Sequence, residues 1–283
     1  NICLALHSFE ALGFESDCEE KFNTMLVGGE GIILVSGPTG SGKTTTLYST
    51  LNKLEEPDVN IVTVEDPIEY DLDNINQAQV STKAGVTFAT ALRSILRQDP
   101  DIIMVGEVRD EETIELGIRA ALTGHLVFST VHTNDAASGF TRLLNWQVEP
   151  FLIASTVKGI LAQRLVRRIC SECKKPYSPT AKELKLAGLD PKEPLKTFRG
   201  KGCLSCRNTG YNGRIGIFEL LLVDGDISEL VLQQAPGYKI REQARKNGMI
   251  SLLISQINQI FHDQIYWHLH HMNQHMIIVV LDL

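Results

Sequence analysis

The stretch that decides the fold is Gly37-Pro38-Thr39-Gly40-Ser41-Gly42-Lys43-Thr44. It matches the phosphate-loop pattern G-x-x-x-x-G-K-[ST] and directly follows the apolar run 32–35, which predicts a buried strand. Glycines let the backbone curl so that N–H groups point inward, and a helix that begins near Lys43 adds the positive end of its dipole. A chance glycine-rich turn is the alternative, and the strand before the motif and the helix after it disfavour that alternative.

This loop predicts a nucleotide site. Lys43 is expected to reach the β- and γ-phosphates of a nucleotide such as ATP, and the Thr44 hydroxyl to hold Mg²⁺. The predicted nucleotide-binding residues are Gly37, Pro38, Thr39, Gly40, Ser41, Gly42, Lys43, Thr44 and Thr45.

Further apolar runs continue outward from the loop. They lie at 61–64, 102–105, 126–128 and, less clearly, 215–218. Segments of helical pattern separate the runs 32–35, 61–64, 102–105 and 126–128. One such segment, 87–98, has apolar residues on a single face. Strands that are apolar throughout and alternate with helices predict an α/β fold whose mostly parallel sheet is covered on both sides.

Carboxylates follow two of the predicted strands. Glu107 comes after the run 102–105, at the edge where parallel sheets bind ligands, and is the candidate general base for an attacking water. Glu65 and Asp66 follow the run 61–64, and next to phosphates they would require a cation, so they are expected to organise the Mg²⁺ shell. The alternatives are a surface glutamate in a solvated turn and an acidic loop kept for solubility.

Histidines and arginines complete the candidate catalytic set. His132 lies at the carboxyl end of the run that begins at residue 126 and is the candidate γ-phosphate sensor, whereas His125 is more plausibly structural. Arg93, Arg97 and Arg109 are candidates for an arginine that neutralises transition-state charge across a subunit boundary. Ordinary ion pairs with Asp99, Asp101 or Glu107 explain these arginines equally well.

Four of the six cysteines form two C-x₂-C pairs: Cys170, Cys173, Cys203 and Cys206. An interval of 29 residues separates the pairs, which is longer than the usual spacing of such sites. Four thiolates suit tetrahedral Zn²⁺ and leave no open coordination position, so a structural zinc is expected. Redox-active pairs are the competing interpretation.

Composition bounds the class of protein. The chain has 283 residues, 43% hydrophobic residues and a formal net charge of −7, which are values of a folded protein with no general attraction to nucleic acid. No stretch approaches the length of apolar residues that a membrane-spanning helix needs. The beginning at Asn1 lacks both an initiator Met and a secretory signal, so we expect a fragment of a longer protein.

The chain divides into five predicted parts. They are a linker from a missing N-terminal domain at 1–30, a nucleotide-binding core at 31–167, a tetracysteine subdomain at 168–213, a C-terminal strand with helices at 214–250 and an atypical tail at 251–283. Helical character is expected over 227–247. The tail holds five of the eight histidines at irregular spacing, which is a weak pattern for metal binding.

Six motifs in order carry a resemblance to a known family. They are GPTGSGKTTTLYSTL, VEDPIEY, LRSILRQDPDIIMVGEVRD, LTGHLVFSTVHTND, LAQRLVRRIC and GCLSCRNTGYNGRIGIFELL. Over about residues 31–248 the chain resembles the secretion ATPases of type II secretion and type IV pilus assembly, the GspE/PulE and PilB group. In that family these segments are similar to the Walker A loop, the acidic box, an atypical Walker B with Glu107, the histidine box and the tetracysteine zinc element.

The resemblance implies a RecA-like P-loop ATPase core that works as a cytoplasmic homo-hexamer, peripheral to the bacterial inner membrane. It would dock on an inner-membrane platform and on cytoplasmic docking proteins, and would use ATP hydrolysis to assemble pilin-like subunits. Retraction motors of the wider family lack the cysteine element, so its presence favours the secretion or assembly branch. The chain departs from the family pattern at both ends: of the family's preceding N-terminal domains we expect only a linker-like stretch, and the tail after Met249 does not follow the usual ending.

Three functions compete. The first is an ATP-hydrolysing motor of type II secretion, with type IV pilus assembly as its close alternative. The second is a scaffold that binds ATP and barely hydrolyses it. The third is a DNA-translocating ATPase of similar core, and the acidic charge balance argues against it.

Overall fold

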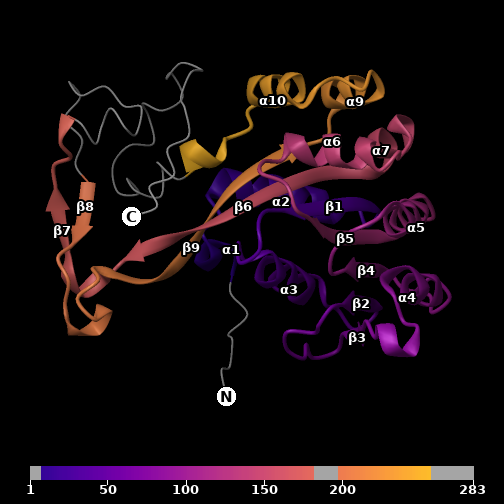
Figure 1. The fold of residues 1–283 in the computed structure, drawn as a ribbon, viewed down its shortest axis with the longest axis horizontal. Helices are drawn as coiled ribbons and strands as arrows, with labels where there is room; N and C mark the ends of the chain where they lie inside the picture. The colour runs from indigo at the N-terminus through magenta and orange to yellow at the C-terminus, as the bar shows by residue number, and fades with distance from the viewer. Residues whose placement is uncertain (1–7, 182–196, 256–283) are drawn as a thin grey trace.

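A central seven-stranded sheet organises the computed structural model, which describes residues 8–181 and 197–255 (Figure 1). The strands are β1 (Gly31–Ser36), β2 (Ile61–Glu65), β3 (Asn76–Gln79), β4 (Ile102–Val105), β5 (Leu126–Val131), β6 (Val157–Ile169) and β9 (Tyr211–Leu222). Their order is β3-β2-β4-β5-β1-β6-β9. Every neighbouring pair is parallel except β6 and β9, which are antiparallel. The predicted mostly parallel α/β fold is confirmed.

Helices cover both faces of this sheet, which explains why the central strands are apolar throughout. One face packs against α1 (Phe9–Leu12), α2 (Ser16–Val27) and α3 (Lys43–Leu54). The other face packs against α4 (Phe88–Ile95), α5 (Glu111–Leu122), α6 (Ala137–Asn145), α7 (Pro150–Thr156), α9 (Gly225–Leu232) and α10 (Gly237–Lys246). Successive side chains of β1 alternate between the two cores, with Ile33 and Val35 in the first and Ile32 and Leu34 in the second.

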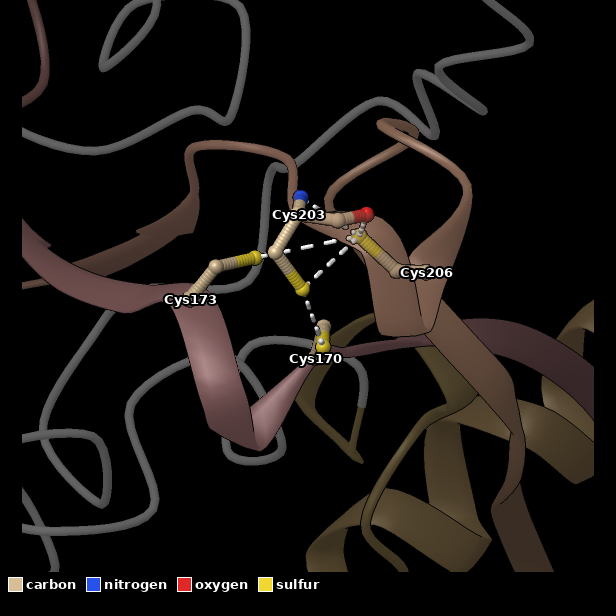
Figure 2. Close-up of side chains that lie close together, drawn as sticks. All are labelled: Cys170, Cys173, Cys203 and Cys206. Atoms are coloured by element: carbon tan, nitrogen blue, oxygen red, sulfur yellow. Dashed lines mark hydrogen bonds between the residues drawn. The ribbon is translucent and has the colours of Figure 1, made fainter.

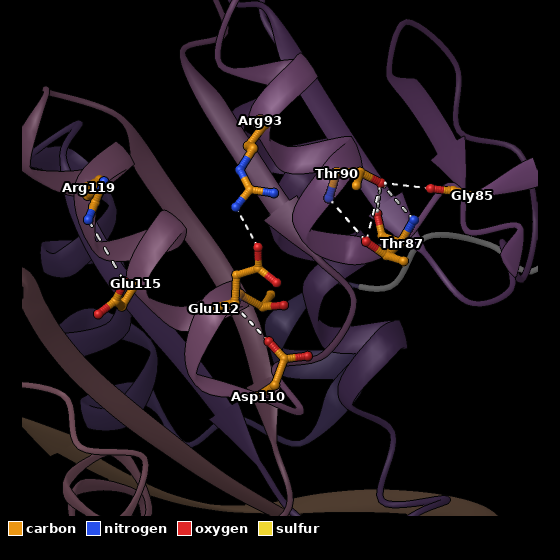
Figure 3. Close-up of polar contacts among 9 residues, drawn as sticks. Gly85, Thr87, Thr90, Arg93, Asp110, Glu112, Glu115 and Arg119 are labelled. Atoms are coloured by element: carbon orange, nitrogen blue, oxygen red, sulfur yellow. Dashed lines mark hydrogen bonds and ion pairs between the residues drawn. The ribbon is translucent and has the colours of Figure 1, made fainter.

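Local capping sets the ends of the helices that were predicted from pattern. The helix expected at 87–98 is α4, which begins after Thr87 because the Thr87 and Thr90 side chains cap it reciprocally. Asp110 likewise caps α5 by accepting the Thr113 N–H at 2.8 Å, and both caps are drawn in Figure 3. The helical stretch expected at 227–247 is two helices, since Pro236 precedes α10 as its N-cap.

The segment predicted as a linker contains α1 and α2 where the structure describes it. Phe22 of α2 is fully buried, and its ring centroid lies 5.4 Å from that of Phe9 and 5.5 Å from that of Phe14. Phe14 in turn contacts Phe218 of β9, with ring centroids 4.0 Å apart. Aromatic side chains spaced along these helices therefore complete the core on the α3 face of the sheet.

Strands β6 and β9 are longer than the others and extend beyond the sheet to the tetracysteine region (Figure 1). There β7 (Lys174–Tyr177) and β8 (Thr197–Gly200) form an antiparallel pair, and two short 3₁₀ turns carry cysteines. The predicted boundaries at residues 168 and 213 fall inside β6 and β9. The division into domains stays a prediction.

Two further sequence expectations meet the limits of the description. The histidine-rich part of the tail, 262–275, lies outside the described residues. Among the helices of residues 8–181 and 197–255, none has the length and apolar character needed to cross a bilayer.

We predict that Phe22→Ala destabilises the chain by about 3–5 kcal/mol, because it deletes a fully buried aromatic ring. Urea unfolding followed by far-UV circular dichroism measures this change. Val27→Ala on the same helix is the control: Val27 is 87% exposed, so its replacement should cost about 0.5 kcal/mol or less. Equal stabilities of the two variants would show that α2 is not part of the folded core.

Candidate active site and metal centre

The predicted phosphate loop joins β1 to α3 as the sequence indicated. β1 ends at Ser36, and α3 begins at Lys43, where Gly42 is the N-cap in the left-handed conformation with a φ of 88°. A Cβ atom at Gly42 would lie 2.9 Å from Nε2 of Gln163, so both the backbone angle and the available space require glycine there. Thr44 and Thr45 lie half-buried in the first turn of α3.

Donor groups of this loop suit a phosphate anion. Lys43 is half-buried and donates from Nζ to the carbonyl oxygens of Gly37 at 2.9 Å and Pro38 at 3.1 Å. Burial lowers the pKa of Lys43, and the negative charge of Glu107 partly offsets this. Ser41 is 3% exposed, and its buried Oγ has no hydrogen-bond partner among the described residues. A buried hydroxyl and a desolvated cation on a glycine-rich curl are the features that an anion would satisfy.

Glu107 lies just beyond the end of β4, and the side chains of Arg109, His132 and Asp66 gather around it. Arg109 donates a short charge-assisted hydrogen bond to Glu107 and also lies 3.6 Å from Asp66. Nε2 of His132 lies 3.5 Å from Oε2 of Glu107. The hydrogen bond to Glu107 raises the pKa of Arg109. The structure thus brings Glu107, Asp66, His132 and Arg109 together, and the charge of Glu107 reaches Lys43.

The hydrogen bonds of Glu65 are separate from those of this cluster, and its expected part in the metal shell stays a prediction. It is 2% exposed and accepts hydrogen bonds from Thr63 Oγ1 at 2.6 Å, from Gln77 Nε2 at 3.1 Å and, at very short range, from Tyr48. Glu65 is the last residue of β2, and its carboxylate joins the end of that strand to α3. β2 ends at Glu65, so Glu65 keeps the inward orientation of the strand, whereas Asp66 belongs to the turn that follows.

Two of the candidate arginines are engaged elsewhere. Arg93 of α4 pairs with Glu112 of α5 (Figure 3), and Arg97 donates to Ser94 Oγ at 3.4 Å. Of the three arginines, the described contacts bring only Arg109 to the carboxylate cluster, and it acts there within its own chain. Nδ1 of His125 lies 2.8 Å from the Ala120 carbonyl oxygen at the end of α5, a local contact consistent with the expected structural role.

Sequence reasoning missed two residues beside the loop, Gln163 and Arg164 of β6. Gln163 Oε1 accepts a hydrogen bond at 2.9 Å from Thr46 in α3, and Arg164 Nη2 donates at 2.8 Å to the carbonyl oxygen of Asn134. Both lie in the quoted segment LAQRLVRRIC, but nothing in that segment by itself indicates contact with the phosphate loop. The available signal was the pairing of β6 with β1, which becomes visible only in the folded sheet.

This arrangement can bind a nucleotide and activate water. The loop amides and Lys43 can hold phosphates, and the Thr44 hydroxyl can hold Mg²⁺. Glu107 can accept a proton from water, provided that Arg109 and His132 leave one of its oxygens available. Asp66 is the second carboxylate that can order the water shell of the metal.

The four predicted cysteine ligands converge into one cluster (Figure 2). Their Sγ atoms all lie within 4.8 Å of one another, and the contacts 170–203, 173–206 and 203–206 measure 3.8, 3.9 and 3.6 Å. Zinc–sulfur bonds of about 2.3 Å in a tetrahedron place sulfur atoms about 3.8 Å apart. The cysteine geometry therefore fits a four-coordinate zinc ion.

Backbone N–H groups of the cluster favour a thiolate. Burial raises the pKa of Cys206, but the N–H groups of Cys203 and Gly210, each 3.2 Å from Cys206 Sγ, outweigh it and lower that pKa overall. A thiolate is the form that binds metal. The two N–H groups thus favour the metal-binding form of Cys206.

Comparison with known proteins gives consistent matches. A Type II secretion system ATPase E of Vibrio cholerae is 52% identical over 232 residues, which are 82% of this chain and 46% of that protein. A type IV pilus assembly ATPase PilB of Thermus thermophilus is 49% identical over 245 residues, or 86% of this chain and 28% of that protein. The crystal structure of the pilus retraction motor PilT with bound ADP has a TM-score of 0.58 and 30% identity, covering 89% of this chain and 66% of that one.

The chain spans less than half the length of these two sequence relatives. Within it, residues 3–267 match the family described as Type II/IV secretion system protein. That match covers most of the chain, and it includes the phosphate loop, the carboxylate cluster and all four clustered cysteines. The chain belongs to the Type II/IV secretion system protein family.

Proposed function

We propose that this chain is the ATP-hydrolysing motor core of a bacterial type II secretion system, which powers pseudopilus assembly and protein export. The observation that carries the proposal is the placement of Glu107 and Lys43 at the same edge of the sheet. Glu107 follows β4, and Lys43 ends the loop that follows β1, with β5 between the two strands, and the charge of Glu107 acts on Lys43. A general base and a phosphate-binding lysine in such proximity serve hydrolysis of the phosphoanhydride bond of ATP better than binding alone.

Each residue has a distinct part in this proposal. The loop 37–42 and Lys43 bind the phosphates of ATP, and Thr44 and Thr45 at the start of α3 hold Mg²⁺ and the adjoining phosphate. Mg²⁺ supplies neutralisation of phosphate charge. Glu107 takes the proton of water, His132 reports the γ-phosphate, and Asp66 orders the metal shell.

Assembly and location follow from the family as proposals. We expect a homo-hexamer in the cytoplasm, peripheral to the bacterial inner membrane, that docks on a membrane platform and on cytoplasmic docking proteins. Type IV pilus assembly is the closest alternative system, and the PilB relative at 49% identity favours it almost as strongly. The tetracysteine cluster would hold a structural Zn²⁺ in either case.

An ATP-binding scaffold with little turnover is the second candidate of another class. One observation favours it: Arg109 and His132 both contact Glu107, so both carboxylate oxygens already have a partner in the described structure. Turnover therefore requires that a bound nucleotide rearranges these contacts.

We predict that Glu107→Gln lowers the rate of phosphate release by about 10²–10⁴-fold, which is the usual contribution of a general base. ATP affinity should stay within about threefold, since the amide fills the same volume. Phosphate release and calorimetric ATP binding measure the two effects. Glu112→Gln, which changes an exposed glutamate paired with Arg93, is the matched control and should leave both values unchanged. Unchanged turnover in Glu107→Gln would support the scaffold.

We predict one Zn²⁺ per chain, bound by the cysteine cluster. Cys203→Ser should lose the metal and lower the thermal unfolding temperature, because the cluster joins the ends of β6 and β9. Elemental analysis and a thermal melt measure both. Cys18→Ser is the control, as Cys18 lies outside the cluster and should keep full zinc content. A purified protein without zinc, whose paired cysteines oxidise reversibly, would favour the redox interpretation instead.

A further inference from the structure

Arg164 lies beside the phosphate loop, within the quoted segment LAQRLVRRIC, for which the sequence alone predicts no role at the nucleotide site. β6 pairs with β1 in a register that places Ala162 opposite Ser36, the last residue of β1. Gln163 and Arg164 therefore continue past the point where β1 turns into the loop. The two strands are parallel, so β6 runs alongside the loop rather than away from it.

Gln163 fixes this part of β6 against both ends of the loop. Its side chain is 2% exposed and bonded to Thr46 of α3. Its backbone oxygen would lie 2.6 Å from a Cβ atom at Gly37, and its Nε2 would lie 2.9 Å from a Cβ atom at Gly42, at the other end of the loop. Such close packing leaves little freedom to the neighbouring Arg164 backbone.

The guanidinium of Arg164 is half-buried and bonded only to neutral acceptors among the described residues. Nη1 donates to the carbonyl oxygen of Gln163 at 3.1 Å, and Nη2 donates to that of Asn134 at 2.8 Å. No carboxylate of the described chain lies within ion-pair distance of it, and Asp135 and Glu219 act on it only from farther away.

Arg164 and Lys43 both lie close to Gly37 of the loop. Arg164 Nη1 donates to the Gln163 carbonyl oxygen that packs against Gly37, and Lys43 Nζ donates to the Gly37 carbonyl oxygen. Burial lowers the pKa of Arg164 and that of Lys43, and the positive charge of Arg164 lowers the pKa of Lys43 further. Their mutual repulsion is unfavourable until an anion enters. Ser41 is 3% exposed, and its Oγ has no hydrogen-bond partner among the described residues. An anion bound at the loop would supply a hydrogen-bond acceptor for this buried hydroxyl.

We propose that Arg164 is a second cation for the phosphate groups of the nucleotide, acting beside Lys43 in the same chain. This inference rests on the proposed nucleotide binding. A guanidinium has five N–H donors, so Arg164 can keep its bond to Asn134 and still bind a phosphate oxygen. Because Asn134 follows His132 by two residues, the same side chain steadies the segment that carries the proposed γ-phosphate sensor.

The test is ATP binding by isothermal titration calorimetry to variants of the full chain. Arg164→Gln removes the charge but keeps an N–H donor for Asn134, and it should weaken the ATP Kd about tenfold or more, as loss of a charge-assisted contact does. The dependence of log Kd on log salt should also become shallower, because one ionic contact is gone. Arg164→Lys should stay within about threefold of the wild type, since it restores the charge. Arg119→Gln, an exposed change of equal charge on α5, should have no effect.

Three outcomes are decisive. An ATP Kd within twofold of the wild type in Arg164→Gln, while Lys43→Ala abolishes binding, would overturn this inference and leave the proposed function intact. Unchanged binding in both variants would remove the proposed function as well. Should Arg164→Gln fail to fold, as judged by circular dichroism, Arg164→Met is the second neutral variant; it keeps the apolar stem, and unchanged ATP affinity in it would equally overturn the inference.

Discussion

Parallel hydrogen bonding along β2, β4, β5, β1 and β6 delivers the ends of five strands to one edge of the sheet. Residues that are distant in sequence therefore meet there: Asp66, the phosphate loop, Glu107, His132 and Arg164. In an antiparallel sheet every second strand would end at the opposite edge, and the same residues would be separated by the length of a strand. The site depends on this alignment more than on any single side chain.

Charge is divided within the site, with cations beside the loop and carboxylates beside β4. Lys43 and Arg164 lack carboxylate partners among the described residues, whereas Glu107 is already paired with Arg109 and His132. A triphosphate would bind Lys43 and Arg164, and it would compete with Glu107 for Arg109 and His132. Binding of the anion could thereby free Glu107 from these contacts, which reconciles its pairing in the described structure with its proposed role as a base.

Local pattern sufficed wherever structure depends on neighbouring residues. The loop that ends at Lys43 was predictable because its glycines, lysine and flanking elements are contiguous, and the cysteine cluster because two C-x₂-C turns each present two thiols. Burial of Glu65 was not, since it depends on Tyr48 from another element. The role of Arg164 could not be predicted for the same reason. It depends on the pairing of β6 with β1, which the sequence of β6 alone does not indicate.

The segment that follows β5 connects this site to the rest of the chain. Arg164 holds the Asn134 carbonyl, Asp135 forms an ion pair with Arg241 of α10 at 2.6 Å, and the Ala136 N–H donates at 2.9 Å to the buried Glu219 of β9. Glu219 also accepts the N–H of Leu252 at 3.2 Å. A change at the phosphates that shifts His132 must therefore either break these bonds or carry α10 and the C-terminal region with it. Because a buried hydrogen bond is costly to leave unmade, a joint movement of this segment with α10 and the C-terminal region requires less free energy than breaking the bonds. The contacts that follow His132, the proposed γ-phosphate sensor, are thus the ones through which ATP hydrolysis would move α10 and the C-terminal region.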